Sequence, residues 1–124
     1  MELNSARVFV RNLAEAQLFY GSLLGLPLKA GGAEHGFCVF APGSTQLVVE
    51  PVNQEDPEDE QELVGRFTGL SVSVPSVAAK YEELRALGVH FTGEPKVQAW
   101  GGTLATFRDP AGNELQLVQL PSAA

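Results

Sequence analysis

The sequence predicts an α+β protein built from two tandem copies of a strand–helix–three-strand module. Each half of the 124-residue chain begins with apolar residues at a period of two, typical of a strand, and continues with apolar residues at helical spacing. Three sequence matches relate the halves in the same order. They pair Val8 and Val10 with Val72 and Val74, residues 24–26 with 87–89, and 46–48 with 116–118, at offsets of 64, 63 and 70 residues. Each half alone would bury too little apolar surface, so we expect the halves to pack together in one chain or across a dimer.

The first half is predicted to contain one strand, one helix and three further strands. Residues 6–10 form the first strand, and Asn12 caps the helix that follows, with Glu15 placed as in a capping box. Gly25 falls where the helix needs a left-handed residue to end, and Pro27 prevents it from resuming. The later strands and the turns between them are expected at 26–30, 36–40 and 46–52, with turns at 31–32 and 42–44.

The second half repeats this order. A strand is predicted at residues 70–74, and Ser76 caps a helix that Gly88 ends. The apolar stripe of that helix consists of Val77, Tyr81, Leu84 and Leu87. Three strands are expected at 89–92, 103–108 and 114–120, and the Asp-Pro-Ala-Gly-Asn sequence at 109–113 has strong turn chemistry.

An acidic linker connects the halves. We expect a single domain, with module one at residues 1–52, the linker at 53–66 and module two at 67–121. The linker carries six of the 15 acidic residues and one base, so it accounts for −5 of the net charge of −7. It is predicted to be solvated, with a short helical turn near residues 61–64. The acidity therefore belongs mostly to the linker and says little about a pocket elsewhere.

Composition excludes several classes of protein. The negative charge argues against a nucleic-acid partner. No apolar run approaches the roughly 18 residues of a membrane span, and no signal segment is recognisable, so we expect a cytoplasmic protein without membrane contact. Cys38 is the single cysteine and lies in an apolar stretch, which excludes an internal disulfide and predicts a buried side chain.

Short motifs in both halves carry a resemblance to a known family. In the first half they are Asn12-Leu13, Phe19-Tyr20 and Leu24-Gly25-Leu26, and in the second Trp100-Gly101-Gly102, Asp109-Pro110-Ala111-Gly112-Asn113 and Leu117-Val118-Gln119. In this order they resemble the vicinal oxygen chelate superfamily, which includes glyoxalase I, extradiol dioxygenases and bleomycin-resistance proteins. The resemblance implies two βαβββ modules whose curled mixed sheets form a ligand trough, and a homodimer.

The resemblance also implies four metal-ligand positions, one on each of four strands. In this chain they are occupied by Ser5, Gln46, Gly69 and Gln116. A divalent metal favours imidazole or anionic oxygen, and none of the four residues supplies either. We therefore expect no metal and no other cofactor. Glu50, four residues beyond Gln46 on the same strand face, would take the third position if the register shifted.

Strand parity in such a fold turns some side chains towards the trough. Arg7 and Glu50 are charges at such positions, and an unpaired buried charge is costly, so they pair with each other, meet solvent or meet a ligand. Aromatic residues would supply the apolar walls that ligand pockets require. The predicted ligand-binding residues are Arg7, Phe9, Phe37, Gln46, Glu50, Trp100, Phe107 and Gln116.

We therefore predict a protein that binds a small organic molecule without a metal, as the drug-sequestering resistance proteins of the superfamily do. The alternative is a lyase, isomerase or dioxygenase of the same superfamily, either metal-dependent or with Glu50 as general base. A third possibility is a module that binds a protein partner through a sheet edge or the acidic linker.

Overall fold

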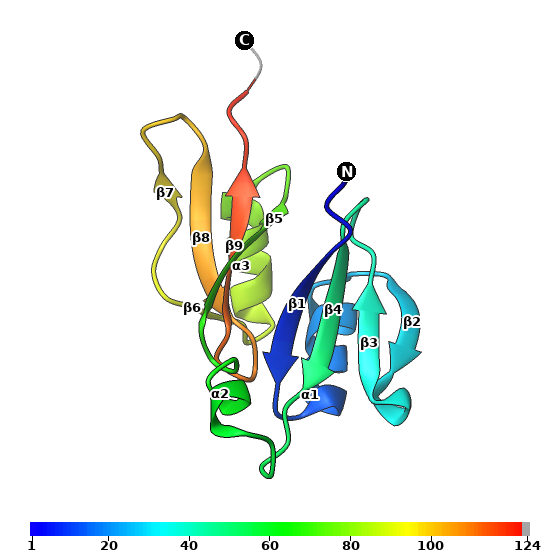
Figure 1. Ribbon diagram of the computed structural model, residues 1–124. Coiled ribbons are helices and arrows are strands. Elements are labelled where there is room, and N and C mark those ends of the chain that lie inside the picture. Colours follow the sequence, from blue (N-terminus) through cyan, green and yellow to red (C-terminus); the bar gives the residue numbers. More distant parts are fainter. Residues whose placement is uncertain (123–124) are drawn as a thin grey trace. The chain divides into compact units, whose positions relative to one another are not determined.

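The computed structural model describes residues 1–122 and divides into two compact units. Unit 1 comprises residues 1–66 together with 110–113, and unit 2 comprises 67–109 together with 114–122. Each unit contains one mixed sheet covered by a helix (Figure 1). Unit 1 has the order expected of a βαβββ module, and unit 2 has the same order with one additional short strand. The predicted fold class is thus confirmed.

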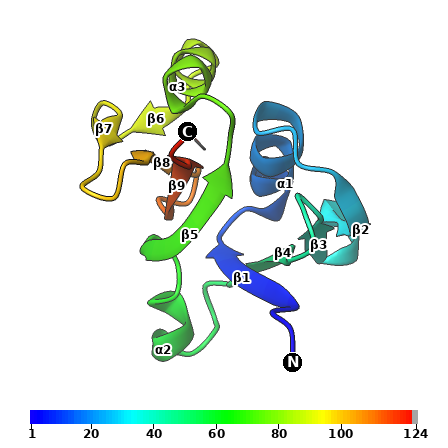
Figure 2. The same ribbon diagram turned by 90° about the horizontal axis from the view of Figure 1, so that it is seen from above.

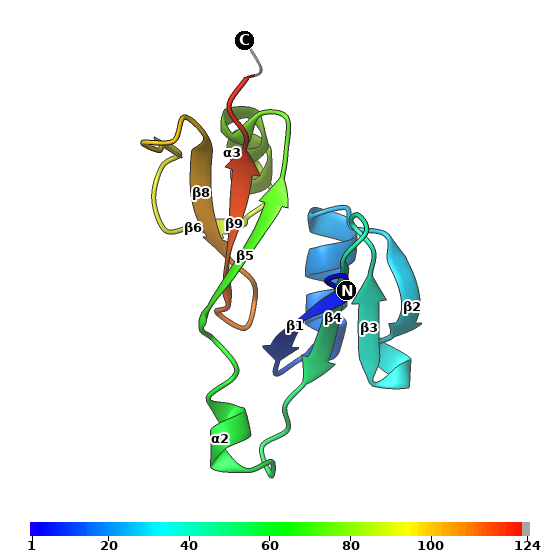
Figure 3. The ribbon, with the colours of Figure 1, turned by 45° about the horizontal axis from the view of Figure 1, so that its top comes forward.

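The sheet of unit 1 has its first and last strands side by side. Its order is β1-β4-β3-β2, in which β1 and β4 are parallel and the other pairs are antiparallel (Figure 3). The strands are β1 (Ser5–Val10), β2 (Leu28–Gly32), β3 (Phe37–Phe40) and β4 (Gln46–Pro51). The predicted turn at residues 31–32 lies within β2, and the chain reverses instead through the 3₁₀ turn η2 (Ala33–His35).

One face of this sheet is covered by α1 (Leu13–Gln17) and the π-helical turn η1 (Leu18–Leu23) that continues it (Figure 2). The Asn12 side chain accepts a hydrogen bond from the Glu15 backbone N–H at 3.0 Å, so the predicted N-cap is present. Gly25, with φ of 73°, follows the helix as expected. The buried side chains between helix and sheet are Val8, Val10, Leu13, Ala16, Phe19, Tyr20, Cys38, Phe40, Leu47 and Val49.

The linker folds against unit 1 and contains α2 (Glu58–Gln61). This helix begins three residues earlier than the predicted turn. Pro57 precedes it and three acidic residues fill its first turn, where negative charge stabilises the helix N-terminus. The Gln61 side chain donates to the carbonyl oxygens of Asn53 at 2.5 Å and of Asp56 at 3.1 Å, which holds the linker in a compact loop.

Unit 2 repeats this topology, but the strands that pair with the outer side of β8 are only two residues long. Its strands and helix are β5 (Phe67–Ser73), α3 (Val77–Ala86), β6 (His90–Phe91), β7 (Lys96–Val97), β8 (Thr103–Arg108) and β9 (Glu114–Gln119). The sheet order is β5-β9-β8-β6, with β7 also pairing with β8. Ser76 Oγ accepts from the Ala79 N–H at 3.1 Å, as its predicted capping role requires. The strand expected at 89–92 is reduced to β6, and β7 was not predicted.

Candidate functional site

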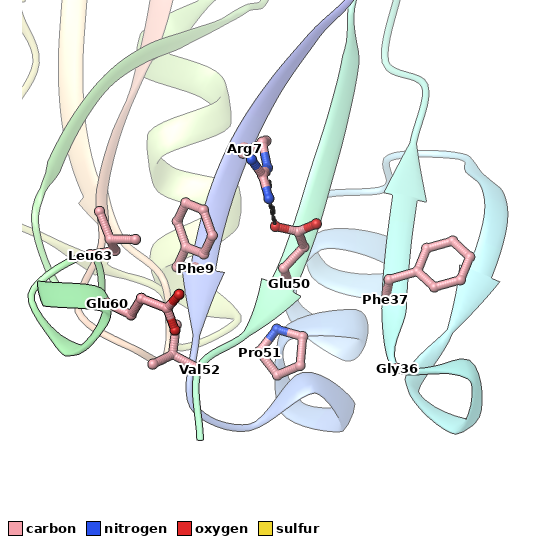
Figure 4. Close-up of a pocket in the computed structure, with 9 residues that line it drawn as sticks. All are labelled: Arg7, Phe9, Gly36, Phe37, Glu50, Pro51, Val52, Glu60 and Leu63. Atoms are coloured by element: carbon pink, nitrogen blue, oxygen red, sulfur yellow. Dashed lines mark hydrogen bonds and ion pairs between the residues drawn. The ribbon is translucent and has the colours of Figure 1, made fainter. Parts of the chain in front are cut away.

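A cavity of about 490 Å³ opens in unit 1, on the sheet face opposite α1. It combines residues of β1, β3 and β4 with residues of the linker (Figure 4). The lining residues are Arg7, Phe9, Gly36, Phe37, Glu50, Pro51, Val52, Glu60 and Leu63. Four of the eight predicted ligand-binding residues therefore meet in one place: Arg7, Phe9, Phe37 and Glu50.

The parallel pairing of β1 and β4 brings the two charged residues together. Phe9 lies opposite Glu50 in the register, so Arg7, Phe9 and Glu50 project from the same sheet face. Arg7 Nε donates to Glu50 Oε2 at 3.0 Å, and Arg7 Nη2 donates to the same oxygen. The Arg7 guanidinium also lies over the Phe9 ring, 5.3 Å from its centroid, within the range of a cation–π contact. Of the three possibilities for these charges, the structure shows mutual pairing.

The linker supplies the wall of the cavity on the far side of Phe9. Glu60 and Leu63 approach from α2 and the turn after it, whereas Glu50 approaches from β4 (Figure 4). A parallel β-bridge between Phe9 and Val64 fixes this segment beside β1. Sequence reasoning missed this wall because it treated residues 53–66 as solvated. The apolar pair Leu63-Val64, within an otherwise acidic run, was the available signal.

Asn113 anchors the end of the linker to β1. Its side chain is 1% exposed and donates from Nδ2 to the carbonyl oxygen of Phe9 at 2.8 Å. Its Oδ1 accepts from the backbone N–H groups of Gly65 at 2.8 Å and Arg66 at 3.3 Å. All these residues belong to unit 1, because the segment 110–113 is part of that unit. Asn113, together with the Phe9–Val64 bridge, thus holds the end of the linker beside β1.

Phe37 lies at the rim of the cavity, where its ring packs over Gly31. A Cβ at Gly31 would lie 2.8 Å from the ring and 2.3 Å from the Phe37 carbonyl oxygen. Gly31 has φ of 78°, a conformation that side-chain-bearing residues rarely adopt. The glycine therefore leaves room for the Phe37 ring and carbonyl oxygen to lie close to the β2 backbone.

The other predicted ligand-binding residues lie elsewhere. Gln46 pairs with Ser5 at the start of β4 and does not line the cavity. Phe107 is fully buried, lies opposite Leu115 and packs against Phe91, so it belongs to the core of unit 2 rather than to a pocket wall. Trp100 is half-exposed in a turn of unit 2.

Gln116 lines a smaller cavity of about 240 Å³ within unit 2. Its Nε2 donates to Thr106 Oγ1 at 3.2 Å, and the remaining walls are mostly polar.

The residues at the family's metal positions do not fit a divalent metal. Ser5 is paired with Gln46 in unit 1. In unit 2 the register of β5 shifts between Phe67 and Ser71, so Ser71 and not Gly69 lies opposite Gln116. Hydroxyl and amide groups are neutral donors, and a divalent metal favours imidazole or carboxylate. Within residues 1–122, no three His, Cys, Asp or Glu side chains form a group that could hold a metal ion.

Cys38 is fully buried, as predicted. It lies opposite Val49 on the helix-facing side of the sheet, and its Sγ is 4.0 Å from Gln17 Oε1. Burial raises the pKa of the Cys38 thiol, and the nearby charge of Glu34 raises it further. A thiol in such surroundings is a poor nucleophile.

Comparison with known proteins identifies the family. Residues 2–117 match the Glyoxalase/Bleomycin resistance protein/Dioxygenase superfamily. The chain belongs to this superfamily. A curated relative, the uncharacterized protein YraH of Bacillus subtilis (strain 168), is 27% identical, with 97% of this chain and 99% of that protein covered.

Solved structures of superfamily members and related proteins share the fold. A superfamily member from Sphaerobacter thermophilus DSM 20745 is 27% identical with a TM-score of 0.80, covering 96% of this chain and 97% of that one. TnmS3, an antibiotic binding protein from Streptomyces sp. CB03234, is 28% identical with a TM-score of 0.76, covering 98% of this chain and 97% of that one. Among the helices of the described residues, none has the length and apolar character needed to cross a membrane.

Proposed function

We propose that this chain binds a small organic molecule in the cavity of unit 1, without a metal ion and without making or breaking a covalent bond. The observation that carries the proposal is the cavity itself. It combines the Arg7–Glu50 ion pair with the apolar walls of Phe9, Val52 and Leu63. Its volume of about 490 Å³ falls within the range of small-molecule sites.

The likeness to TnmS3 supports a binding role, since that protein is described as an antibiotic binding protein. The poor donor set at the family's metal positions supports a mechanism without a metal. Ligand affinity would then come from burial of apolar surface against Phe9 and Leu63, and from hydrogen bonds to the charged pair. Glu50 Oε1 makes no hydrogen bond within the described residues and is available as an acceptor.

Calorimetric titration tests this proposal. Bleomycin, doxorubicin and simpler aromatic molecules of each charge are titrated into the protein, and we expect measurable heat with at least one of them. Phe9→Ala should weaken that binding by about tenfold, as truncation of a central aromatic contact does. The matched control Phe67→Ala removes an exposed ring of unit 2 and should leave affinity unchanged. Heat at the noise level with every probe would contradict the proposal.

Metal analysis separates this proposal from the enzymatic alternative. Protein purified without a chelator should contain no stoichiometric zinc, nickel, manganese or iron. A stoichiometric metal that Gln46→Ala or Gln116→Ala removes would instead place a metal at the family positions. A role for Glu50 as a general base would use Oε1, because two donors of Arg7 hold Oε2. Glu50→Gln would then abolish turnover while sparing ligand affinity.

We also propose that the chain forms a homodimer, as the family resemblance implies. Sedimentation velocity at micromolar concentration should give the mass of two 13.2 kDa chains. A single monomeric species across that range would contradict this part of the proposal.

A further inference from the structure

We infer that the unit 1 cavity selects cationic ligands with a flat apolar body. This inference rests on the proposed function, since it names the class of molecule that the same cavity binds. It follows from the position of the linker. The sequence places most of the net negative charge in a linker that it predicts to be solvated, whereas the structure places Glu60 and Leu63 of that linker in the cavity wall.

The charges in the cavity wall sum to a net negative value. Arg7 and Glu50 neutralise each other through their ion pair. Glu60 is the third charged residue in the lining. Its carboxylate makes no ion pair or hydrogen bond with another residue of the described chain. A ligand cation would therefore meet one uncompensated carboxylate, and a ligand anion would be repelled by it.

The rest of the linker reinforces this preference. Residues 53–66 carry a net charge of −5, and all of them belong to unit 1. Two bases lie in or beside this segment, Arg66 and Arg11, and Arg11 donates to both the side-chain and the backbone oxygen of Gln61. Exposed charges act over roughly 8 Å at physiological ionic strength, so the linker acids nearest the cavity raise the local concentration of cations.

The shape and apolar character of the walls define the rest of the ligand. The apolar residues of the lining include Phe9, Leu63, Val52 and Pro51, beside the charged groups. One face of the Phe9 ring is covered by Arg7, and Leu63 approaches Phe9 from the linker side (Figure 4). A flat aromatic body buries most area against such walls and leaves its positive group beside Glu60.

A pair of probes that differ in charge tests the inference. Proflavine is a planar three-ring cation, and 9-anthracenecarboxylate is a planar three-ring anion. By calorimetry at about 25 mM salt, we expect proflavine to bind at least about tenfold more tightly. Raising the salt to about 300 mM should weaken proflavine binding several-fold, because screening shortens the reach of the linker charges. It should leave the anion unaffected or slightly improved.

Variants then locate the selectivity. Glu60→Gln should weaken proflavine binding by about two- to fivefold, the size expected of an exposed charge pair, and should strengthen binding of the anion. Glu15→Gln is the matched control, because Glu15 is an exposed acid on α1, which packs on the opposite face of the same sheet. It should change neither affinity.

The outcomes distinguish the two claims. If 9-anthracenecarboxylate binds as tightly as proflavine or more tightly, and Phe9→Ala weakens it, the cation preference is wrong and the proposed binding function stands. If Glu15→Gln and Glu60→Gln weaken proflavine equally, the selectivity does not arise at the cavity and the inference is wrong. If neither probe nor any of the antibiotics binds, the proposed function fails as well.

Discussion

Arg7 and Glu50 stand on neighbouring parallel strands, and one carboxylate oxygen of Glu50 receives both the Nε and an Nη donor of Arg7. The pair lies on the cavity face of the sheet, partly open to water, with side-chain exposures of 59% and 30%. Water screens such a pair and replaces its hydrogen bonds when it breaks. Its geometry therefore contributes more to the shape of the cavity than to the stability of the fold.

A double-mutant cycle with Arg7→Gln and Glu50→Gln should give a coupling energy below about 1 kcal/mol in the free energy of unfolding. Urea denaturation of the four proteins measures it. The two single variants should keep a cooperative transition. A coupling energy above about 2 kcal/mol would show that the pair is an essential part of the folded core.

Asn113→Ala should be far more damaging. It removes the hydrogen bonds described above, which join the buried Asn113 side chain to the Phe9 carbonyl and to the N–H groups of Gly65 and Arg66. We expect a loss of about 2–4 kcal/mol in the free energy of unfolding. Asn53→Ala is the matched control, because Asn53 is exposed and only its backbone atoms form hydrogen bonds. Equal effects of the two substitutions would refute the anchoring role.

Gly31→Ala should destabilise unit 1 by at least about 2 kcal/mol. The new Cβ would meet the Phe37 carbonyl oxygen at 2.3 Å in a backbone conformation unsuited to alanine. Gly43→Ala offers the comparison, since no atom lies within 4 Å of a Cβ there. That change should be neutral or slightly stabilising. Thermal unfolding measures the Tm of both variants. An unaltered Tm for Gly31→Ala would show that β2 can move away from Phe37.

Phe107→Ala should cost about 3–5 kcal/mol, because the ring is fully buried and packs against Phe91 in the unit 2 core. Phe67→Ala, at a position with 58% exposure, should cost much less. Denaturant titrations compare the two. If Phe107→Ala were nearly neutral in stability, the assignment of this residue to the core would be mistaken.

The Cys38 thiol links stability to pH. Its pKa is higher in the folded chain than in the unfolded one, chiefly because burial disfavours the thiolate. The protonated thiol therefore contributes its full stability below the unfolded pKa of about 8.5, and this contribution is lost as the pH rises through that value towards the folded pKa. The stability difference between the natural chain and Cys38→Ala should accordingly shrink above about pH 8.5. A difference that stays constant from pH 7 to pH 10 would contradict the raised pKa.

Local signals explain why much of the fold was predictable. The caps Asn12 and Ser76 and the period of two in β1 and β5 depend on neighbours in the sequence, and the structure contains each of them. The strand β7 has two residues and no pattern of its own. It exists because β8 offers a partner, which only the tertiary structure determines.

The candidate site also has a part that the sequence predicts and a part that depends on the tertiary structure. Parity along β1 and β4 predicted that Arg7, Phe9 and Glu50 share a face, because the period of a strand is fixed. The contribution of Glu60 and Leu63 depends on where the linker packs. The end of the linker is held by a hydrogen bond from Gly65 to Asn113, which is distant in the sequence. The aromatic character of Phe107 predicts a pocket wall, but the residue lies opposite Leu115 on the buried face of the sheet.

The hydrogen bond between Asn113 and Phe9 joins residues that are 104 positions apart. A contact of this span is slow to form, because nearly the whole chain must be brought back on itself. During synthesis, which proceeds from the N-terminus, the strands and helix of unit 1 are complete long before residue 113 emerges. The cavity wall that the linker supplies is therefore expected to be among the last features of unit 1 to become ordered. A chain truncated after residue 109 would keep β1 to β4 and lack the Asn113 hydrogen bonds that hold the linker against them.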